Sequence, residues 1–304
     1  MTNLTSVPGA DVVPTPAAKS AGRKPAVKRE VNALTGMAHI GLILWALATA
    51  GPLIWVVLAS FKTNTEIFLG RPFALPQSWS FQTYADAWTQ AHVGRYFLNS
   101  VIVVLLSTAG TMLLGSMAAY VLARYTFPGN RAVYYLFVAG MTFPMFLALV
   151  PLFFVVRNLG LIGTYPGLIL VYVAYALPFT VFFLVGFFRT LPVSLIEAAL
   201  LDGCSHAGVF FRIMLPLARP GIISVGIFNF LGLWNQFILP LVLMPDKSKY
   251  VLSQGLAVLA ANQGYRSDWS ALFAGLVIAI LPVLVVYVAF QRRIQEGLAF
   301  GGFK

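Results

Sequence analysis

Six long apolar runs dominate this sequence, and their centres contain no aspartate, glutamate, lysine or arginine. Each run is long enough to cross the hydrocarbon core of a membrane, which takes about 20 helical residues. A chain that crosses lipid must pair its own backbone groups, and the alternation of about ten residues that marks barrel strands is absent. We therefore predict an all-α integral membrane protein with six transmembrane helices. The predicted spans are 37–61, 97–123, 132–156, 166–188, 220–244 and 269–290.

The composition agrees with a lipid environment and excludes an ordinary soluble domain. The chain of 304 residues is 59% hydrophobic and 10% charged, whereas soluble domains are about 45–50% apolar and about 25% charged. A net charge of +11 would suit a nucleic-acid-binding protein, but the basic residues form no cluster and are not interleaved with aromatic residues. The single cysteine, Cys204, provides neither a disulfide framework nor metal-ligand spacing. We expect contact with membrane lipid and no binding to nucleic acid.

The two ends of the chain differ from its apolar middle. Residues 1–36 are rich in proline, alanine, lysine and arginine, so we predict a disordered tail. A signal peptide is the alternative, but the run that follows is longer than a signal h-region of about 7–15 residues and lacks a small-residue cleavage site. The predicted transmembrane domain is 37–295, and 296–304 form a short C-terminal tail.

Basic residues outside the apolar runs predict the orientation, because positively charged loops are enriched on the cytoplasmic side. With the N-terminus inside, thirteen lysine and arginine residues lie on the inner side and seven on the outer side. Both termini, and therefore both tails, are predicted to be cytoplasmic. The inner set is Lys19, Arg23, Lys24, Lys28, Arg29, Arg124, Arg131, Arg189, Arg212, Arg219, Arg292, Arg293 and Lys304, and the outer set is Lys62, Arg71, Arg95, Arg157, Lys247, Lys249 and Arg266.

The sequence lacks the residues that several kinds of functional site require. No G-x-x-x-x-G-K-[ST] loop is present to bind ATP. The spans have no central carboxylate for a proton- or ion-coupled carrier, and His39, His92 and His206 are far apart, with no metal-ligand spacing. No nucleophile elbow or H-E-x-x-H motif is present either. We therefore expect a non-catalytic membrane subunit with no catalytic residue, no metal site and no cofactor of its own.

The segment 190–219, between the fourth and fifth predicted spans, is unusually polar. Ser194 and Glu197 fit a capping box at the start of a short helix, and Gly203 permits a bend. Pro216 suits the first turn of a second helix that leads into the fifth span. We predict two short helices on the cytoplasmic surface, with small residues at 198, 199 and 203 forming a shallow face.

This segment carries the signature EAA-x3-G-x9-I-x-LP at full spacing, and it resembles the binding-protein-dependent ABC importer permeases. Other stretches resemble the carbohydrate branch of that family, in particular the MalG-like subunits of maltose systems. The resemblance covers residues from about 97 to the C-terminus and, more loosely, the first span. One departure is Gln236, where the family pattern has an acidic residue after Trp-Asn. The matching stretches are "NSVIVVLLSTAGTMLLGSMAAYVLARYTFPG" (99–129), "PLFFVVRNLGLIGTYPGLIL" (151–170), "WNQFILPL" (234–241) and "GLAFGGFK" (297–304).

The resemblance implies a coupling helix that docks into a groove of a cytoplasmic ATPase. It also implies a heterodimer with a second permease subunit, two ATPase subunits that bind ATP and Mg, an extracytoplasmic solute-binding protein, and a place in the bacterial inner (plasma) membrane. For Glu197, Gly203 and Asp202 the alternatives are, respectively, a helix cap, a plain turn and a solvated charge. The residues that match the coupling motif are Glu197, Ala198, Ala199, Asp202, Gly203, Ile213, Leu215 and Pro216.

Four polar or amphipathic residues fall on the fifth predicted span: Asn229, Trp234, Asn235 and Gln236. Polar groups in lipid are costly unless they are paired, so these side chains should face other helices or a solute pathway. Both interpretations remain open. Two outer segments, 62–95 with Trp79, Tyr84 and Trp88, and 254–266 with Gln254, are candidate surfaces for the binding protein, and an interfacial aromatic belt explains the first equally well.

The resemblance implies a permease for a neutral mono- or oligosaccharide, moved through alternating access by closure of the ATPase. The uncharged spans agree, since an ionic solute would favour a fixed countercharge. The alternatives are a permease for a polyol or glycerol-phosphate type of solute and an ATPase-independent secondary carrier; a membrane scaffold or enzyme needs no pathway at all.

Overall fold

The computed structural model describes residues 33–262 and 268–301, and within these ranges all regular structure is helical. Residues 1–32 and 302–304, which belong to the predicted tails, lie outside the described part. The predicted boundary of the N-terminal tail is wrong at residues 33–36: α1 begins at Ala33, so these residues are helical. The elements are α1 (Ala33–Ala59), α2 (Asn64–Leu69), α3 (Gln82–Thr89), α4 (Val93–Arg124), α5 (Asn130–Thr142), α6 (Met145–Asn158), α7 (Tyr165–Thr190), α8 (Ser194–Leu201), α9 (His206–Val209), the π-helical η1 (Phe210–Met214), α10 (Leu215–Leu217), α11 (Arg219–Trp234), α12 (Ile238–Leu243), the 3-10 turn η2 (Lys247–Lys249), α13 (Leu252–Ala261) and α15 (Trp269–Gly301).

Four helices are long and apolar enough to cross a membrane: Thr35–Ala59, Val93–Arg124, Tyr165–Thr190 and Trp269–Gln291. Two further pairs of helices pass the same test together but are bent, α5 with α6 by 106° and the segment His206–Leu217 with α11 by 76°. The described residues therefore contain between four and six candidate spans. The chain divides into two compact units, 1–50 and 51–304, and the remaining description concerns the second unit.

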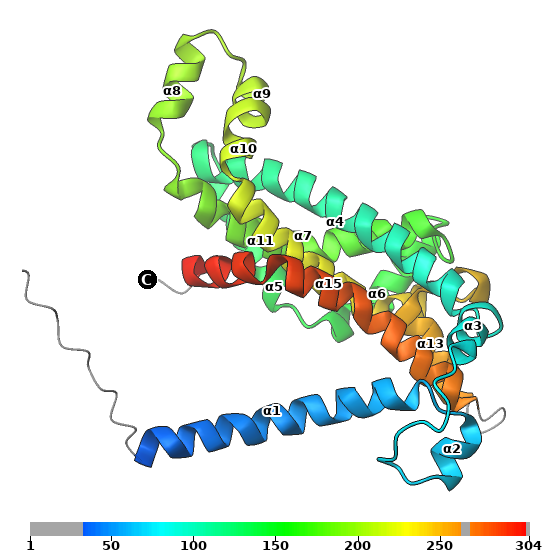
Figure 1. Ribbon diagram of the computed structural model, residues 1–304. Coiled ribbons are helices and arrows are strands. Elements are labelled where there is room, and N and C mark those ends of the chain that lie inside the picture. Colours follow the sequence, from blue (N-terminus) through cyan, green and yellow to red (C-terminus); the bar gives the residue numbers. More distant parts are fainter. Residues whose placement is uncertain (1–32, 263–267, 302–304) are drawn as a thin grey trace, which may run out of the picture. The chain divides into compact units, whose positions relative to one another are not determined.

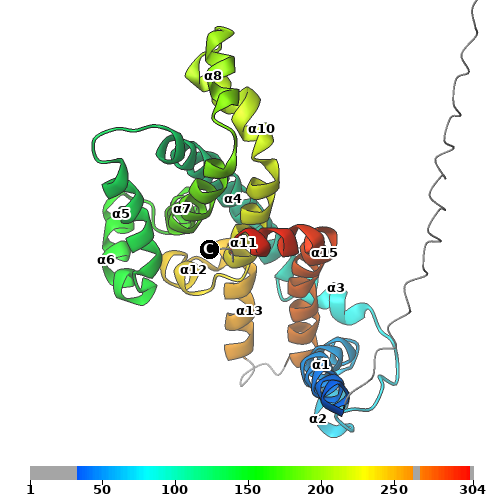
Figure 2. The same ribbon diagram turned by 90° about the vertical axis from the view of Figure 1, so that its left-hand side faces the viewer.

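The centre of the second unit is the pair formed by α4 and α7, which pack along their length (Figures 1 and 2). Small residues recur every fourth position on the buried face of α4: Ser107, Thr111, Gly115 and Ala119. A Cβ atom at Gly115 would lie 2.5 Å from Cγ2 of Thr180 on α7, so the two backbones approach too closely for a larger residue. Small residues at i and i+4 are the usual means of close helix packing in lipid, where apolar side chains gain little by leaving the solvent.

The bend between α5 and α6 and the break between α11 and α12 have local causes in the sequence. Pro144 separates α5 from α6, since proline lacks an N–H and holds the preceding residue, Phe143, in an extended conformation (φ −71°, ψ 123°). The fifth predicted span, 220–244, is interrupted between Trp234 and Ile238, and Pro240 lies in the first turn of α12, where its missing N–H costs no hydrogen bond. By contrast, Pro178 and Pro282 lie inside the continuous helices α7 and α15.

The apolar core consists of two clusters. One lies toward α13 and α12 and includes Trp234, Leu239 and Leu252. The other lies at the opposite end of α4, where Tyr120, Phe188, Phe210 and Met214 join the ends of α4 and α7 to the segment α8–α10. This segment projects beyond the ends of α4 and α7 in both views, and the last turns of α15 lie toward the same end (Figures 1 and 2).

Candidate functional site

The projecting segment 190–219 begins with α8, and the predicted capping box at its start is absent. Val193 occupies the N-cap position, no side chain caps the helix there, and Ser194 is the first helical residue. The cause is Pro192: it keeps Leu191 extended (φ −73°, ψ 145°), and the following Val193 is already in the helical region (φ −67°, ψ −33°). The helix therefore starts before Ser194 can act as its cap, and Glu197 points outward, free of a capping role.

Gly203 ends α8 in a Schellman motif. Its φ is +81°, the left-handed region that glycine tolerates best. The N–H of Gly203 donates to the carbonyl of Leu200 at 3.1 Å, and the N–H of Cys204 donates to that of Ala199 at 2.9 Å. These two bonds satisfy the terminal carbonyls of α8 and reverse the chain into α9.

The exposed part of this turn, which we call the tip, consists of Glu197, Ala198, Leu201, Asp202 and Gly203. Leu201 is 88% exposed, so almost none of its apolar surface is covered by the described part of the chain. The predicted shallow face of small residues is wrong at Ala199, whose side chain is only 6% exposed and packs into the cluster beneath the tip. Ala199 lies two positions from Glu197 and Leu201, and residues two apart on a helix point to different faces.

The chain returns from the tip through α9, η1 and α10. Ser205 caps α9, since its hydroxyl accepts the N–H of Gly208 at 3.1 Å. The π-turn η1 follows, and the N–H of Leu215 donates to the carbonyl of Phe210, five residues back. This wider turn accommodates Pro216, which lacks an N–H and would collide with a carbonyl one tight turn earlier.

Pro216 lies in the first turn of a helix, as predicted, but that helix is the three-residue α10, which ends before the fifth span. The helix that leads into the fifth span is α11, which begins at Arg219 and has Pro220 in its first turn. Ile213 and Leu215 are half-buried against the cluster beneath the tip. The motif residues thus divide into an exposed tip and a packed base.

The four charges of the segment are all exposed, and none of them forms an ion pair with any residue that the structure describes. Glu197 and Asp202 lie on the tip, and Arg212 and Arg219 lie on the return. A solvated, unpaired charge contributes little to the stability of the chain itself. These side chains are therefore available to a partner.

The four candidate pathway residues do not form one site. Asn229 is buried and donates a hydrogen bond to Oγ1 of Thr180 at 2.7 Å. Trp234 is buried elsewhere, and its Nε1 donates to the carbonyl of Ala279 on α15 at 3.1 Å. Asn235 is exposed and bonds its own helix at Leu231, and Gln236 accepts the N–H of Phe237. Asn229 and Trp234 thus have the interhelical bonds that were the alternative to pathway lining.

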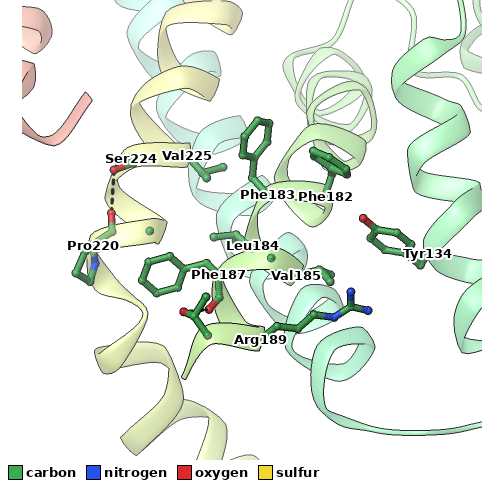
Figure 3. Close-up of a pocket in the computed structure, with 13 residues that line it drawn as sticks. Tyr134, Phe182, Phe183, Leu184, Val185, Phe187, Arg189, Pro220, Ser224 and Val225 are labelled. Atoms are coloured by element: carbon green, nitrogen blue, oxygen red, sulfur yellow. Dashed lines mark hydrogen bonds between the residues drawn. The ribbon is translucent and has the colours of Figure 1, made fainter. Parts of the chain in front are cut away.

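The structure also contains a pocket of about 310 Å³ between α5, α7 and α11, near the end that carries the tip (Figure 3). Its walls are mostly aromatic and aliphatic. Arg189 extends along it toward Tyr134, with the guanidinium carbon 5.7 Å from the centre of the ring (Figure 3). No pattern in the sequence predicts this pocket, because phenylalanines that line a pocket and phenylalanines that pack between helices look alike in an apolar run.

The candidate surfaces for a binding protein are only partly supported. Gln254 is 1% exposed and donates to the carbonyl of Met244 at 2.8 Å, so it is not on a surface. Residues 263–267 lie outside the described part. In the segment 62–95, Trp79 is exposed, whereas Tyr84 is hydrogen-bonded to Ser60 at 2.7 Å between their hydroxyl oxygens.

Four helices of membrane-spanning length and two bent pairs of apolar helices are features of an integral membrane protein. Residues 111–299 match the family described as "Binding-protein-dependent transport system inner membrane component". The chain belongs to this family and is a multi-pass integral protein of the inner membrane.

Individual relatives can be named. The chain is 56% identical over 268 residues to the diacetylchitobiose uptake system permease protein NgcG of Streptomyces coelicolor, with 88% of each chain covered. It is 32% identical over 253 residues to the trehalose transport system permease protein SugB of Mycobacterium tuberculosis, covering 83% of this chain and 92% of that one. A crystal structure of a bacterial ABC transporter involved in the import of the acidic polysaccharide alginate has the same fold, with a TM-score of 0.77, 21% identity and coverage of 88% and 99% of the two chains.

Proposed function

We propose that this chain is the membrane-spanning permease subunit of an ATP-driven ABC importer for a neutral oligosaccharide, with an acetylated disaccharide as the first candidate. The family description supports the transport role. The relative at 56% identity is a diacetylchitobiose uptake permease, which supports the choice of solute. The absence of charge from the centres of the apolar runs is compatible with a solute that carries none.

In this proposal α5 with α6 crosses the membrane once, and α11 with α12 crosses it once, as the fifth predicted span 220–244 requires, which gives six spans together with the four long helices. The end that carries the tip is cytoplasmic, and so are both termini. Two arguments support the orientation: thirteen basic residues against seven favour it, and the last turns of α15 lie toward the end that carries the tip (Figure 1). The tip therefore faces the compartment that contains ATP.

The tip docks into a cytoplasmic ATPase, and this is the step that the geometry supports best. A sequence signature at full spacing folds into an exposed hairpin, and Leu201 at its end is left uncovered by the residues that the structure describes. Ala199, Ile213 and Leu215 instead hold its base on the apolar cluster, while Pro216 is accommodated by the π-turn before it. A tip on a packed base transmits displacement to α7 and α11, because a packed core does not deform continuously.

The importer needs further subunits. A second permease completes a heterodimer, two ATPase subunits bind ATP and Mg, and an extracytoplasmic protein delivers the solute. Closure of the ATPase pair on ATP draws the tips together and opens the pathway outward, and hydrolysis resets it. Such a cycle requires only that ATP binds one of two states more tightly. Asn235 and Gln236, at the break between α11 and α12, are the remaining candidates for pathway lining.

The docking step is tested by replacing Leu201 with aspartate and purifying the tagged chain with its partners from native membranes. Because Leu201 is 88% exposed, L201D leaves the fold of the chain unchanged. We expect a loss of about 2 kcal/mol of ATPase affinity, the value typical of a buried anchor. The matched control is Leu69→Asp, at a leucine that is 84% exposed on α2, outside the projecting segment. Full recovery of ATPase with L201D would exclude the docking surface.

The solute is tested by uptake in cells that lack the chain and in cells that express it again. Restored uptake of labelled diacetylchitobiose, with glucose and glycerol 3-phosphate unaffected, is the expected result. Uptake of glycerol 3-phosphate instead would assign the chain to the alternative class of solute. Unchanged uptake after the ATPase is removed would indicate a secondary carrier.

A further inference from the structure

The end of α4 contacts both arms of the projecting segment, although it is distant from them in sequence. Arg124, the last residue of α4, donates from Nη2 to the carbonyls of Phe188 and Leu191. These carbonyls belong to the last turn and the C-cap of α7, where helical carbonyls lack their i+4 partner; that of Phe188 also accepts the N–H of Leu191 at 3.3 Å. The positive guanidinium also lies at the negative end of the α7 dipole, where a cation is stabilising. Arg124 thus holds the arm that leads into α8.

Tyr125, the next residue, contacts the returning arm. Its hydroxyl is 2.9 Å from Nδ1 of His206, the first residue of α9, and the two rings meet edge to face with centroids 5.6 Å apart. Tyr120, one turn earlier on α4, packs its ring against Phe188 on one arm and Phe210 on the other, at 5.7 and 5.2 Å. The end of α4 is therefore fastened to the entry and the exit of the tip.

The turn that follows α4 fixes the position of Tyr125. The side-chain amide of Asn130 donates to the carbonyl of Tyr125 at 2.8 Å and to that of Leu122 at 3.3 Å. Gly129, with φ +88°, allows the chain to turn back so that this amide can reach. The stretch from Arg124 to Asn130 is thus a turn whose conformation is held by the side-chain amide of Asn130.

The opposite end of α4 is fastened in the same manner to the segment between α12 and α13. Asn99 donates from Nδ2 to the carbonyl of Tyr250 at 2.9 Å and to that of Ser248 at 3.3 Å, and its Oδ1 accepts the hydroxyl of Tyr165 at 2.8 Å. The adjacent Ser100 accepts the N–H of Leu252 at 2.7 Å. One continuous helix therefore has specific hydrogen bonds to the tip segment at one end and to the opposite surface segment at the other.

We infer that α4 is the rigid link between the ATPase-docking segment and the outer segment 244–252, with Arg124 and Tyr125 as positioning residues at one end and Asn99 at the other. The inference rests on the proposed function, which supplies the motion that the link transmits. Displacement of the tip moves α4 as well as α7 and α11, and α4 moves the outer segment. A change in the state of the ATPase thereby changes the position of the outer segment, on the face where a binding protein delivers solute.

The test uses the assembled importer reconstituted in lipid vesicles, with variants that remove single bonds. Tyr125→Phe keeps the ring and removes the hydroxyl. Arg124→Gln removes the guanidinium group that bonds both carbonyls, and Arg124→Lys keeps a cation that can bond only one of them. The readouts are the amount of ATPase bound, the solute moved per ATP hydrolysed, and the stimulation of hydrolysis by the loaded binding protein. Tyr135→Phe, at an exposed tyrosine on α5, is the control.

We expect the ATPase to remain bound in every variant, while solute moved per ATP falls by about fivefold in Y125F and R124Q, the effect of about 1 kcal/mol on a two-state equilibrium. R124K restores part of the loss, and Asn99→Ala reduces stimulation by the binding protein without affecting ATPase binding. Unchanged transport per ATP in Y125F and R124Q complexes that retain their ATPase would overturn the inference. Absence of ATPase from the unmodified complex would instead refute the proposed function.

Discussion

The side-chain amide of Asn229 donates a hydrogen bond of 2.7 Å to the hydroxyl of Thr180, and this bond joins α11 to α7 inside the bundle. Thr180 in turn donates to the carbonyl of Ala176 at 2.9 Å, so the hydroxyl both accepts and donates. Neither side chain is exposed. The pair is a satisfied polar contact between two helices that flank the projecting segment.

Replacing Asn229 with leucine should lower the free energy of unfolding in detergent by about 0.6–2 kcal/mol, the range found for interhelical hydrogen bonds in membranes. Thermal unfolding of the purified chain measures this. Asn235→Leu is the control, because Asn235 is exposed and bonds only within its own helix. If N229L changes uptake selectivity and leaves stability untouched, Asn229 lines the pathway instead.

Gly115→Ala should destabilise the α4–α7 pair by about 1–3 kcal/mol, the usual cost of overpacking. The added Cβ would lie 2.5 Å from Cγ2 and 3.1 Å from Cβ of Thr180. Thr180→Ser removes Cγ2 and keeps the hydroxyl that Asn229 needs. In thermal unfolding, the double variant G115A/T180S should therefore regain a large part of the stability that G115A loses. If the stability changes of G115A and T180S simply add in the double variant, the contact with Cγ2 of Thr180 is not the cause of the loss in G115A.

Gly203→Ala should weaken the turn at the tip by about 1–2 kcal/mol, because alanine is strained at φ +81°. Gly203→Asn should cost less, since asparagine tolerates this region. Gly232→Ala is a matched control: both glycines have open space where a Cβ would be, and only Gly203 has positive φ. Hydrogen exchange at the amides of Gly203 and Cys204 reports the loss directly. Equal protection in G203A and the unmodified chain would contradict the assignment.

The outer helix α2 should lose its N-terminal cap in acid. Hydrogen bonds from the backbone N–H of Thr63, and also from that of Gln77, hold the pKa of Glu66 below its usual value. A lowered pKa contributes stability above the ordinary range of a glutamate, and this contribution is lost as the pH falls through the folded-state value. The protection factors of the α2 amides, which are exchange rates relative to those of an unfolded chain at the same pH, should therefore fall at acid pH in the native chain and stay constant with pH in Glu66→Gln.

The apolar runs predicted the existence of the helices well, because lipid leaves a spanning backbone no alternative to a helix. The points at which helices break were harder to predict. Pro144 bends the chain by 106°, whereas Pro178 lies within a continuous helix, and the sequence around the two prolines contains nothing that separates these outcomes. The difference depends on neighbouring helices, such as the packing of Gly140 against the ring of Pro178.

The candidate site was predictable where chemistry is local. The left-handed turn at Gly203 follows from glycine, whereas the start of α8 was misplaced because the effect of Pro192 outweighed the capping signal of Ser194. The contacts of Arg124 with Phe188 and of Tyr125 with His206 join residues that are far apart in sequence. No periodicity or spacing within one chain encodes such pairs.

In the hairpin at Gly203, the backbone conformation does not depend on which side chains the exposed positions carry. Its geometry is maintained by main-chain bonds and one glycine, so the outward side chains of Glu197, Ala198, Leu201 and Asp202 can be exchanged at almost no cost to folding. A chain built in this way can be retuned toward a different motor protein by a few surface substitutions. Grafting those four side chains between related transporters is then a direct route to hybrid machines.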